Sequence, residues 1–374
     1  MAGIYIHIPF CKQACNYCNF HFSTSFGLKN DLLKAIHDEL EQQRNYLEGQ
    51  PIETIYIGGG TPSLLSADEI NRISEHIFQL FVVELKEFTL EANPDDLSLN
   101  YLRSLKNTPV NRFSIGVQSF KEADLQYMNR AHNASEAEYA IKAAQDTGFE
   151  KLSIDLIYGT PGLTDNEWLN NLMKVKELQI PHFSAYALTV EEGTALHHSI
   201  KKKRPRPVDN EQAAAQFEIL AEQAAAMGYD HYEISNLALP GQYAIHNTNY
   251  WKGIPYLGIG PSAHSYNANK RQWNIANNAL YIKSLLGDNK LNFELETLTP
   301  KQQLNEYIMT SLRTMWGCDL DKIANEYGST IIKQILHDAE EFFEKQQLTQ
   351  EENKLFLTHK GKLFADHIAA SLFV

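Results

Sequence analysis

The sequence predicts an α/β fold built on a parallel sheet, and three observations carry that prediction. Six short runs rich in Val, Ile, Tyr and Phe recur along the first half of the 374-residue chain, as buried parallel strands do. A segment with helical spacing of its apolar residues follows these runs. The chemistry-bearing residues stand at the ends of the runs, where α/β folds place their sites. An open doubly wound sheet and a barrel both satisfy this pattern.

The predicted strands are recognised by their composition. They cover residues 3–9, 54–58, 87–92, 112–118, 151–158 and 182–188. Helical spacing follows over residues 28–47, 67–81 and 135–147. The second of these helices begins behind Ser66, with Glu69 three residues later, which predicts a capping box. We therefore expect βα units joined by right-handed crossovers.

The chain changes character after residue 200. A basic, proline-rich segment over residues 201–207 is predicted to be a solvated loop, with a contact for an anionic ligand or a membrane surface as the alternative. A helix over residues 209–227 and a strand over residues 230–239 are expected next. Residues 243–278 are rich in Gly, Asn, Tyr and Trp, and this composition predicts ordered loops beside a site.

The last part of the chain is predicted to form a small separate domain. Helical patterns over residues 304–314, 319–327 and 331–345 precede a hairpin signal over 348–357 and a last helix over 358–372. Three helices with a hairpin are compatible with a winged-helix-like shape. The expected organisation is a core over residues 1–235, a loop-rich extension over 236–297 and the C-terminal domain over 298–374.

Composition and charge exclude several classes of protein. The chain has 33 Lys and Arg against 46 Asp and Glu, a net charge of −13, so nucleic acid is not an expected partner. Its apolar runs stay below the about 18 residues of a membrane span. The first residues lack the basic region and long apolar core of a signal peptide. Four cysteines do not make a secreted disulfide scaffold, and we expect a cytoplasmic protein.

Three of the four cysteines lie within eight residues, in the loop after the first predicted strand. Cys11, Cys15 and Cys18 have the spacing C-x3-C-x2-C. A zinc site would normally need a fourth ligand, which His7 or His21 could supply. A [4Fe–4S] cluster usually takes four cysteines, so three would leave one iron open for another ligand. The spacing therefore indicates a metal or cluster site.

The cysteine motif, with an aromatic residue before its last cysteine, resembles that of the radical S-adenosylmethionine superfamily. In that superfamily the amino and carboxylate groups of S-adenosylmethionine chelate the open iron. The motifs IYIHIPFC, IGGGTPSLL, LEANPD, IGVQSF, DLIYGTPG and HNTNYW further resemble the oxygen-independent coproporphyrinogen oxidase-like family, in its haem chaperone branch. The resemblance covers essentially the whole chain and implies a partial, six-stranded (β/α) barrel.

The resemblance also implies an S-adenosylmethionine site at the strand ends. The positions matching the family's cofactor contacts are Tyr5, Tyr17, Gly59, Gly60, Thr61, Glu91, Gln118, Arg130, Asp155 and Ala187. The residue types suit such a ligand. Glycines let the backbone approach closely, carboxylate and amide groups suit a ribose diol or an ammonium, and Arg130 suits a carboxylate through a two-pronged pair.

The motif HNTNYW, residues 246–251, is the expected haem site. His246 could ligate haem iron through a ring nitrogen, with Tyr250 and Trp251 stacking on the macrocycle. On residue types alone, a histidine bonded within the protein beside core aromatics is the commoner arrangement. The resemblance favours haem binding, because the motif is associated with haem in that family. His264 matches a position near the family's cofactor cavity.

The function implied by the resemblance is a haem chaperone. It would hold a [4Fe–4S] cluster, S-adenosylmethionine and haem, and deliver haem to an acceptor, plausibly a membrane-bound respiratory protein. The alternative is an oxygen-independent coproporphyrinogen III oxidase, and a third class is a radical enzyme acting on an unrelated substrate. The oxidase has a fourth cysteine where this chain has Phe20, and an N-terminal arm that this sequence does not show. Both departures favour the chaperone branch.

Overall fold

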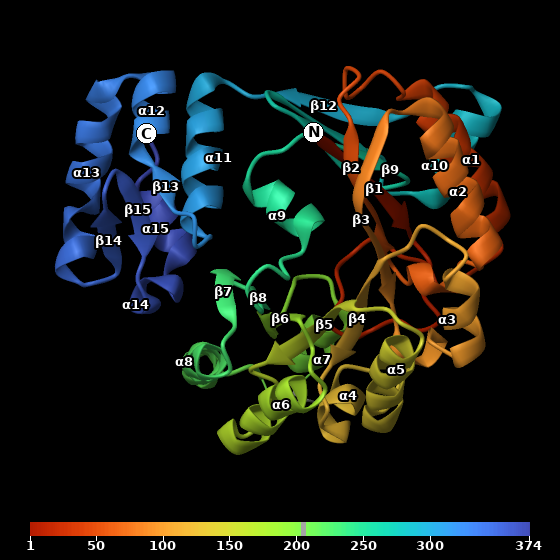
Figure 1. The fold of residues 1–374 in the computed structure, drawn as a ribbon, viewed down its shortest axis with the longest axis horizontal. Coiled ribbons are helices and arrows are strands. Elements are labelled where there is room, and N and C mark those ends of the chain that lie inside the picture. Colours follow the sequence, from red (N-terminus) through yellow and green to blue (C-terminus); the bar gives the residue numbers. More distant parts are fainter. Residues whose placement is uncertain (203–206) are drawn as a thin grey trace.

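The structure is a computed structural model that describes residues 1–202 and 207–374, so most of the basic segment over 201–207 lies outside the described residues. Six parallel strands stand side by side in chain order, and helices cover one face of their sheet (Figure 1). The strands are β1 (Ala2–Ile8), β2 (Ile52–Gly59), β3 (Val83–Ala92), β4 (Arg112–Gln118), β5 (Lys151–Tyr158) and β6 (His182–Ala187). Each overlaps a predicted run, and the α/β fold is confirmed.

Helices follow these strands along the chain, and several of them begin at a capping residue. They are α1 (Lys29–Gln42), α2 (Ala67–Leu80), α3 (Leu99–Leu105), α4 (Glu122–Tyr127), α5 (Ala134–Asp146), α6 (Asp165–Glu177), α7 (Ala195–Lys201) and α8 (Asn210–Ala226). The predicted capping box of α2 is present, because the Glu69 amide donates to Ser66 Oγ and the Ser66 amide to the Glu69 carboxylate. Such caps fix where the helix begins.

The sheet continues beyond the six parallel strands at both edges. The additional elements are β7 (Asp230–Glu233), β8 (Asn236–Ala238), β9 (Tyr256–Ile259), β10 (His264–Asn267), β11 (Lys270–Asn274) and β12 (Phe293–Thr297), with α9 (Ile245–Trp251), α10 (Asn278–Ile282) and the π-helical turn Lys283–Gly287. The order runs from β12 to β9, then β1 to β6, then β8 and β7. The two outermost strands do not pair, so the barrel is partial. The expectation of loops is wrong for much of 243–278, because this region contains α9, β9, β10 and β11. Its strands are too short to show a hydrophobic period in the sequence.

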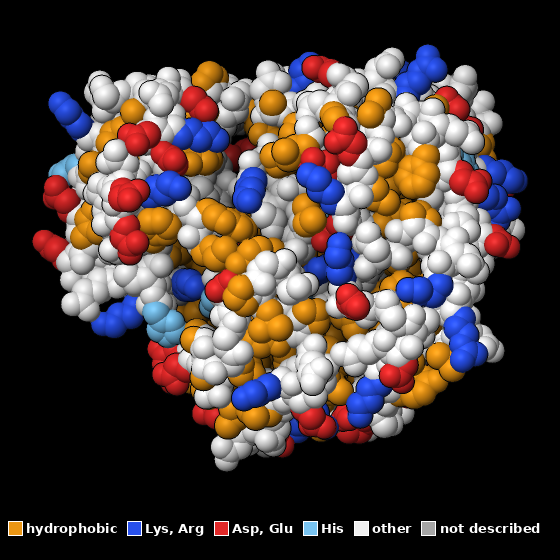
Figure 2. Space-filling view, in the orientation of Figure 1, with side chains coloured by type: hydrophobic (Ala, Val, Ile, Leu, Met, Phe, Trp, Pro, Cys, Tyr) orange, Lys and Arg blue, Asp and Glu red, His pale blue; other side chains and the backbone are white. Residues whose placement is uncertain are grey.

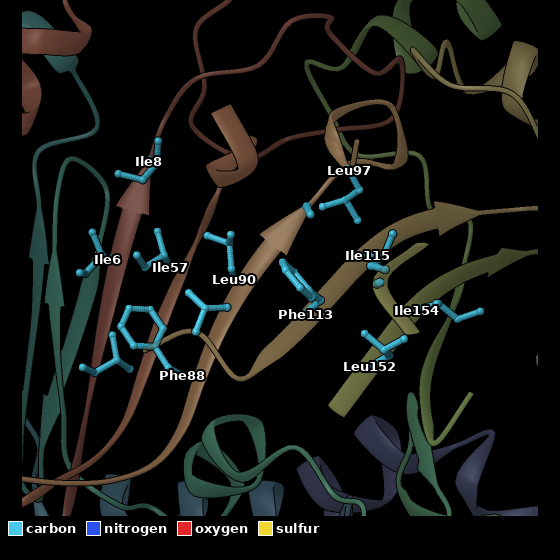
Figure 3. Packing of buried hydrophobic residues seen from close by; sticks show 14 of the residues in the cluster. Ile6, Ile8, Ile57, Phe88, Leu90, Leu97, Phe113, Ile115, Leu152 and Ile154 are labelled. Carbon is cyan, nitrogen blue, oxygen red and sulfur yellow. The ribbon is translucent and has the colours of Figure 1, made fainter. Parts of the chain in front are cut away.

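Strand side chains alternate between an apolar outer face and a polar inner face. The outer face packs under the helices through buried residues that include Ile6, Ile57, Phe88, Phe113 and Ile154 (Figure 3). The inner face carries Tyr56, Glu91, Ser114, Asp155 and Ser184. The expectation of strands apolar on both faces is therefore wrong for the inner face, whose side chains line a cavity rather than a second hydrophobic layer.

The C-terminal domain is a small unit with its own hydrophobic core. It contains α11 (Pro300–Leu312), β13 (Cys318–Asp319), α12 (Leu320–Tyr327), α13 (Ser329–Glu344), β14 (Leu348–Glu351), β15 (Lys354–Leu357), α14 (His359–Lys362) and α15 (Ala365–Ser371). The predicted hairpin is present as β14 and β15, and the predicted last helix is interrupted between α14 and α15. Buried Cys318 belongs to this core, as a free cysteine with a hydrophobic role does.

The C-terminal domain attaches to the barrel at the β7–β8 edge. The Met315 amide donates to the Tyr232 carbonyl oxygen at 3.0 Å, and the Ile234 amide donates to the Arg313 carbonyl oxygen at 3.1 Å. Arg313 also pairs with Glu233. In Figure 1 the domain stands to the left of the barrel, with α9 between them. Among the described residues, no helix has the length and apolar character needed to cross a membrane.

Candidate functional site

The carboxyl ends of the parallel strands open into one large cavity. Its volume is about 1010 Å³, at the upper limit of the roughly 300–1,000 Å³ that is usual for small-molecule sites. Its walls come from the loop after β1, the ends of β2 to β6, α8 and the C-terminal domain. The cavity therefore joins the cysteine loop to a part of the chain more than 300 residues away in sequence.

The loop that carries the three cysteines is tied to the ends of the first two strands. Its own ends meet, because the Cys11 amide donates to the Ser23 carbonyl oxygen at 3.0 Å. The amide of Thr61 donates to the Phe10 carbonyl oxygen at 2.7 Å, so the turn after β2 holds the residue before Cys11. A Cβ atom on Gly60 would lie 2.6 Å from that same oxygen. Only glycine permits this close approach of the two backbones.

Cys11, Cys15 and Cys18 all line the cavity. Zinc and a [4Fe–4S] cluster make different demands on these three thiols. Among the side chains of residues 1–202 and 207–374, no group of three or more His, Cys, Asp and Glu is close enough to hold one metal ion. His7, which could complete a zinc site, is engaged through both ring nitrogens, by the Tyr5 hydroxyl at 3.0 Å and the His21 carbonyl oxygen at 2.9 Å. Three thiols on one loop fit a [4Fe–4S] cluster better, because its cysteines bind different irons.

Nine of the ten residues expected to contact S-adenosylmethionine line the same cavity. They are Tyr17, Gly59, Gly60, Thr61, Glu91, Gln118, Arg130, Asp155 and Ala187. The exception is Tyr5, whose hydroxyl bonds His7 and whose ring centroid lies 6.0 Å from that of Tyr56. The sequence motifs thus identify a set of residues that the fold brings together.

Arg130 is the cation at the base of the cavity. Its Nη1 donates to Cys15 Sγ at 3.2 Å, and its Nη2 donates to Asn93 Oδ1 and to the Gly116 carbonyl oxygen, both at 2.8 Å. Its Nε is buried without a partner. A buried N–H group without an acceptor costs free energy, so this atom fits a ligand that brings an oxygen.

Two carboxyl groups face the same space. Glu91 accepts from the Tyr56 hydroxyl at 2.7 Å and the Gly59 amide at 2.9 Å. Burial raises the pKa of Glu91 to about 7, and the nearby carboxyl of Asp155 contributes. Burial likewise raises the pKa of Asp155 to about 6. Carboxylates that are costly to ionise favour a cationic partner, and S-adenosylmethionine carries both positive groups and a carboxylate.

Asn93 is a cavity residue that the sequence reasoning missed. Its amide oxygen accepts from Arg130, and its amide nitrogen donates to Thr61 Oγ1 at 3.3 Å. It therefore connects the turn after β2 to the guanidinium. The signal was present, because Asn93 belongs to the same LEANPD motif as Glu91 and stands two residues after it.

The motif HNTNYW forms α9, at the opposite end of the barrel from the cysteines. The carboxylate of Glu87 accepts from the amides of Ile245 at 2.9 Å and His246 at 2.8 Å, so it caps the start of the helix. Thr54 lies near the start of β2 and bonds His246 Nδ1 at 2.8 Å. The helix therefore covers the amino-end half of the inner face.

The geometry does not present His246 to a haem. Its side chain is buried, its Nε2 bonds the Tyr250 hydroxyl at 2.8 Å, and its Nδ1 bonds Thr54. Burial lowers its pKa to about 3. Trp251 packs under the Arg313 guanidinium, 5.2 Å from the ring centroid. His246, Tyr250 and Trp251 do not line the cavity, whereas Asn247 of the same motif does. Their contact with haem stays a prediction.

His264 also lies away from the main cavity. It lines a second cavity of about 380 Å³ beside Trp273, and the two ring centroids are 6.1 Å apart. That cavity is formed by β10, β11 and the start of β12. His264 is therefore not part of the site that contains the cysteines.

The parallel strands and the three-cysteine loop define the class of protein. The profile of the Radical SAM superfamily matches residues 5–175, and the profile of the HemN C-terminal domain matches residues 298–364. A solved structure titled as coproporphyrinogen III oxidase (HemN) from Escherichia coli superposes with a TM-score of 0.86 over 100% of this chain and 90% of that chain. Its sequence identity is 21%, so this likeness shows the fold alone. The fold is that of a radical SAM protein.

Relatives with higher sequence identity identify the family within this superfamily. Heme chaperone HemW of Bacillus subtilis is 33% identical over 374 residues, which cover 98% of this chain and 98% of the relative. Heme chaperone HemW of Lactococcus lactis is 34% identical, over 96% of this chain and 93% of the relative. The chain belongs to the HemW family.

Proposed function

We propose that this chain is a haem chaperone that binds haem and passes it to an acceptor protein. The observation that carries the proposal is the single cavity that runs from the cysteine loop to the C-terminal domain. It supplies room for a macrocycle beside a cofactor. The names of the relatives that match almost end to end support haem as the ligand. We further propose that the protein works in the cytoplasm, with a membrane-bound respiratory haem protein as the acceptor.

The cluster belongs on Cys11, Cys15 and Cys18 in this proposal. When bound, a [4Fe–4S] cluster held by three thiolates supplies one iron with an open coordination position. The chain's own part is to keep the three thiols on one short loop and to hold that loop against Gly60 and Thr61. The hydrogen bond from Arg130 to Cys15 keeps the guanidinium beside this sulfur.

S-adenosylmethionine belongs beside the cluster. Arg130 would pair with its carboxylate, because the guanidinium is buried and one of its N–H groups has no acceptor. Glu91 and Asp155 would face its amino, sulfonium or ribose groups, since both carboxyls lack a cation within ion-pair distance among the described residues. Gly59, Gln118, Tyr17 and Ala187 would complete the walls, as they line the same cavity. Tyr5 would support them from below.

The alternative activity, oxidative decarboxylation of coproporphyrinogen III, has only the likeness of fold in its favour. The test is a pair of incubations with anaerobically reconstituted protein. One contains haem, and we expect binding near one haem per chain with a Soret band. The other contains coproporphyrinogen III, S-adenosylmethionine and a strong reductant, and we expect no protoporphyrinogen. Turnover of coproporphyrinogen without haem binding would replace the chaperone by the oxidase.

A further inference from the structure

Four exposed apolar side chains line the rim of the cavity. Phe20 is 70% exposed, Phe364 48%, Tyr186 42% and Leu363 37%, and all four line the cavity. They come from three separate parts of the chain: the cysteine loop, the end of β6 and the α14–α15 junction. Single exposed apolar residues are ordinary, whereas several around one cavity mark a binding surface. On the face shown in Figure 2, hydrophobic side chains also gather where the C-terminal domain meets the barrel.

Two cations stand at the same rim. Arg313 is held by Glu233 and Asp366, with its Nη1 2.7 Å from the Asp366 carboxylate. Lys362 makes no ion pair among the described residues, and its Nζ donates to the His231 carbonyl oxygen at 3.3 Å. Burial lowers the pKa of Lys362 to about 8. An anionic group close to this ammonium would raise that pKa again.

One histidine lines this cavity. All fourteen histidines of the chain lie within the described residues, and His367 is the only one of them on the cavity wall. It stands in the first turn of α15 and is exposed. Its ring packs edge-on against Phe342, with 5.9 Å between centroids, and within the described residues its ring nitrogens make no hydrogen bond. This is the opposite of buried His246, whose nitrogens are both engaged.

We propose that haem binds at the rim formed by the C-terminal domain and the cysteine loop, with His367 as an axial ligand of the iron and Lys362 as the partner of a propionate. This inference rests on the proposed chaperone function and deepens it by placing the haem. Haem is a flat apolar disc with two carboxylates on one edge. The segment 362–367 offers a cation, the apolar Leu363 and Phe364, and a free imidazole within six residues. Phe20 and Tyr186 face the same space from the barrel side.

The arrangement also accounts for Phe20. A cysteine at this position would add a fourth thiol next to the cluster loop. Phe20 instead exposes an aromatic ring, 70% accessible, on the cavity wall. Aromatic rings stack on flat conjugated ligands. In this placement the haem lies over the cofactor region, and the C-terminal domain supplies both the iron ligand and the propionate contact.

The first test compares histidine variants of the full, anaerobically reconstituted chain. His367→Ala should shift the Soret band and weaken haem binding tenfold or more, and added imidazole should restore the band position. The matched control is His337→Ala, an exposed histidine on α13 of the same domain that does not line the cavity. It should bind haem as the wild type does. Circular dichroism establishes that each variant is folded.

The outcomes separate this inference from the chaperone proposal. If the wild type binds haem while His367→Ala keeps its Soret band and affinity, the placement is wrong and the chaperone proposal stands. Loss of the band in folded His246→Ala, with the band retained in His367→Ala, overturns the placement in the same way. If the wild type binds no haem, the chaperone proposal itself fails.

A second test examines the propionate contact. Lys362→Met removes the charge and keeps an apolar stem of similar length. We expect it to weaken binding of haem about tenfold and to leave binding of haem dimethyl ester unchanged, because the ester has no carboxylates. Equal weakening for both ligands would show that Lys362 acts through the fold and would remove it from the site.

Discussion

The two ends of the barrel both carry buried charged side chains, and they differ in how those charged side chains are partnered. At the amino end, the carboxylate of Glu87 caps α9, and Arg112 bonds Ser153 Oγ at 2.6 Å. At the carboxyl end, Arg130 keeps a buried N–H without an acceptor, and Glu91 has a pKa raised to about 7 by burial. Buried polar groups in a purely structural region are generally satisfied.

The difference separates charged residues that stabilise the fold from charged residues that are available to a ligand. Ser153 also bonds His182 Nδ1 at 2.8 Å, and His182 Nε2 bonds the Tyr232 hydroxyl at 2.7 Å, so the amino end forms a chain of contacts across the barrel. The HNTNYW motif belongs to this end. We infer that its helix closes the floor of the barrel and thereby supports the cavity above it.

The largest expected effect comes from removing one cysteine at the open end. Cys15→Ser should abolish the cluster, because the loop has no further cysteine that could replace the lost ligand. Iron analysis after anaerobic reconstitution should give about four irons per chain for the wild type and almost none for the variant. Cys318→Ser is the control, since Cys318 is buried in the C-terminal core. A full cluster in Cys15→Ser would disprove the assignment.

A change at the closed end should affect stability rather than ligand binding. Arg112 is 2% exposed and lies 3.9 Å from the Glu87 carboxylate. Arg112→Met leaves that carboxylate without its cation, which should cost about 3–5 kcal/mol in urea-induced unfolding. Lys34→Met, which breaks the exposed pair with Asp31, should cost about 0–1 kcal/mol. Equal losses of unfolding free energy in the two variants would show that the buried pair at the amino end stabilises the fold no more than an exposed pair does.

Removing the charged groups at the open end should lower the affinity for S-adenosylmethionine. Arg130→Ala removes the proposed carboxylate partner of S-adenosylmethionine, and Asp155→Ala removes a proposed partner of its ribose or amino group. A hydrogen bond to a charged group contributes about 1.5–3 kcal/mol, so affinity should fall about tenfold or more in equilibrium dialysis. Exposed Arg103 on α3 supplies the control Arg103→Ala. Unchanged binding in both cavity variants would mean that the site lies elsewhere.

The features that can be predicted from the sequence are those that depend on residues close together in the chain. The strands, the capping box at Ser66 and the cysteine loop depend on spacing within a few residues. The closed end depends on contacts across the chain: Thr54 and His246 are separated by 192 positions. A histidine in a loop-like motif gives no local sign of whether its nitrogens meet a metal or a hydroxyl. The short strands β9 to β11 were likewise hidden, because four or five residues are too few to show a hydrophobic period, and β10 and β11 are mostly polar.

The last expected effect is a pH dependence confined to the open end. The raised pKa values of Glu91, about 7, and Asp155, about 6, mean that the ligand-free protein holds protons that a cationic ligand must displace. Their neighbours in the cavity, Arg130 and Tyr56, keep their charge states in this range, because a guanidinium stays protonated and burial raises the pKa of the Tyr56 phenol.

Affinity for S-adenosylmethionine should therefore fall as the pH decreases from about 7.5 to about 6, by up to tenfold per pH unit for each proton taken up. In Glu91→Gln the affinity should be lower throughout, and its dependence on pH should be weaker, because one of the two titrating groups is gone. Glu84→Gln, at an exposed position on β3, should retain the wild-type profile. If the affinity instead rises as the pH decreases, the two carboxylates do not contact the cationic part of the ligand. The two ends of the barrel would then differ only in Arg130 and the cysteines.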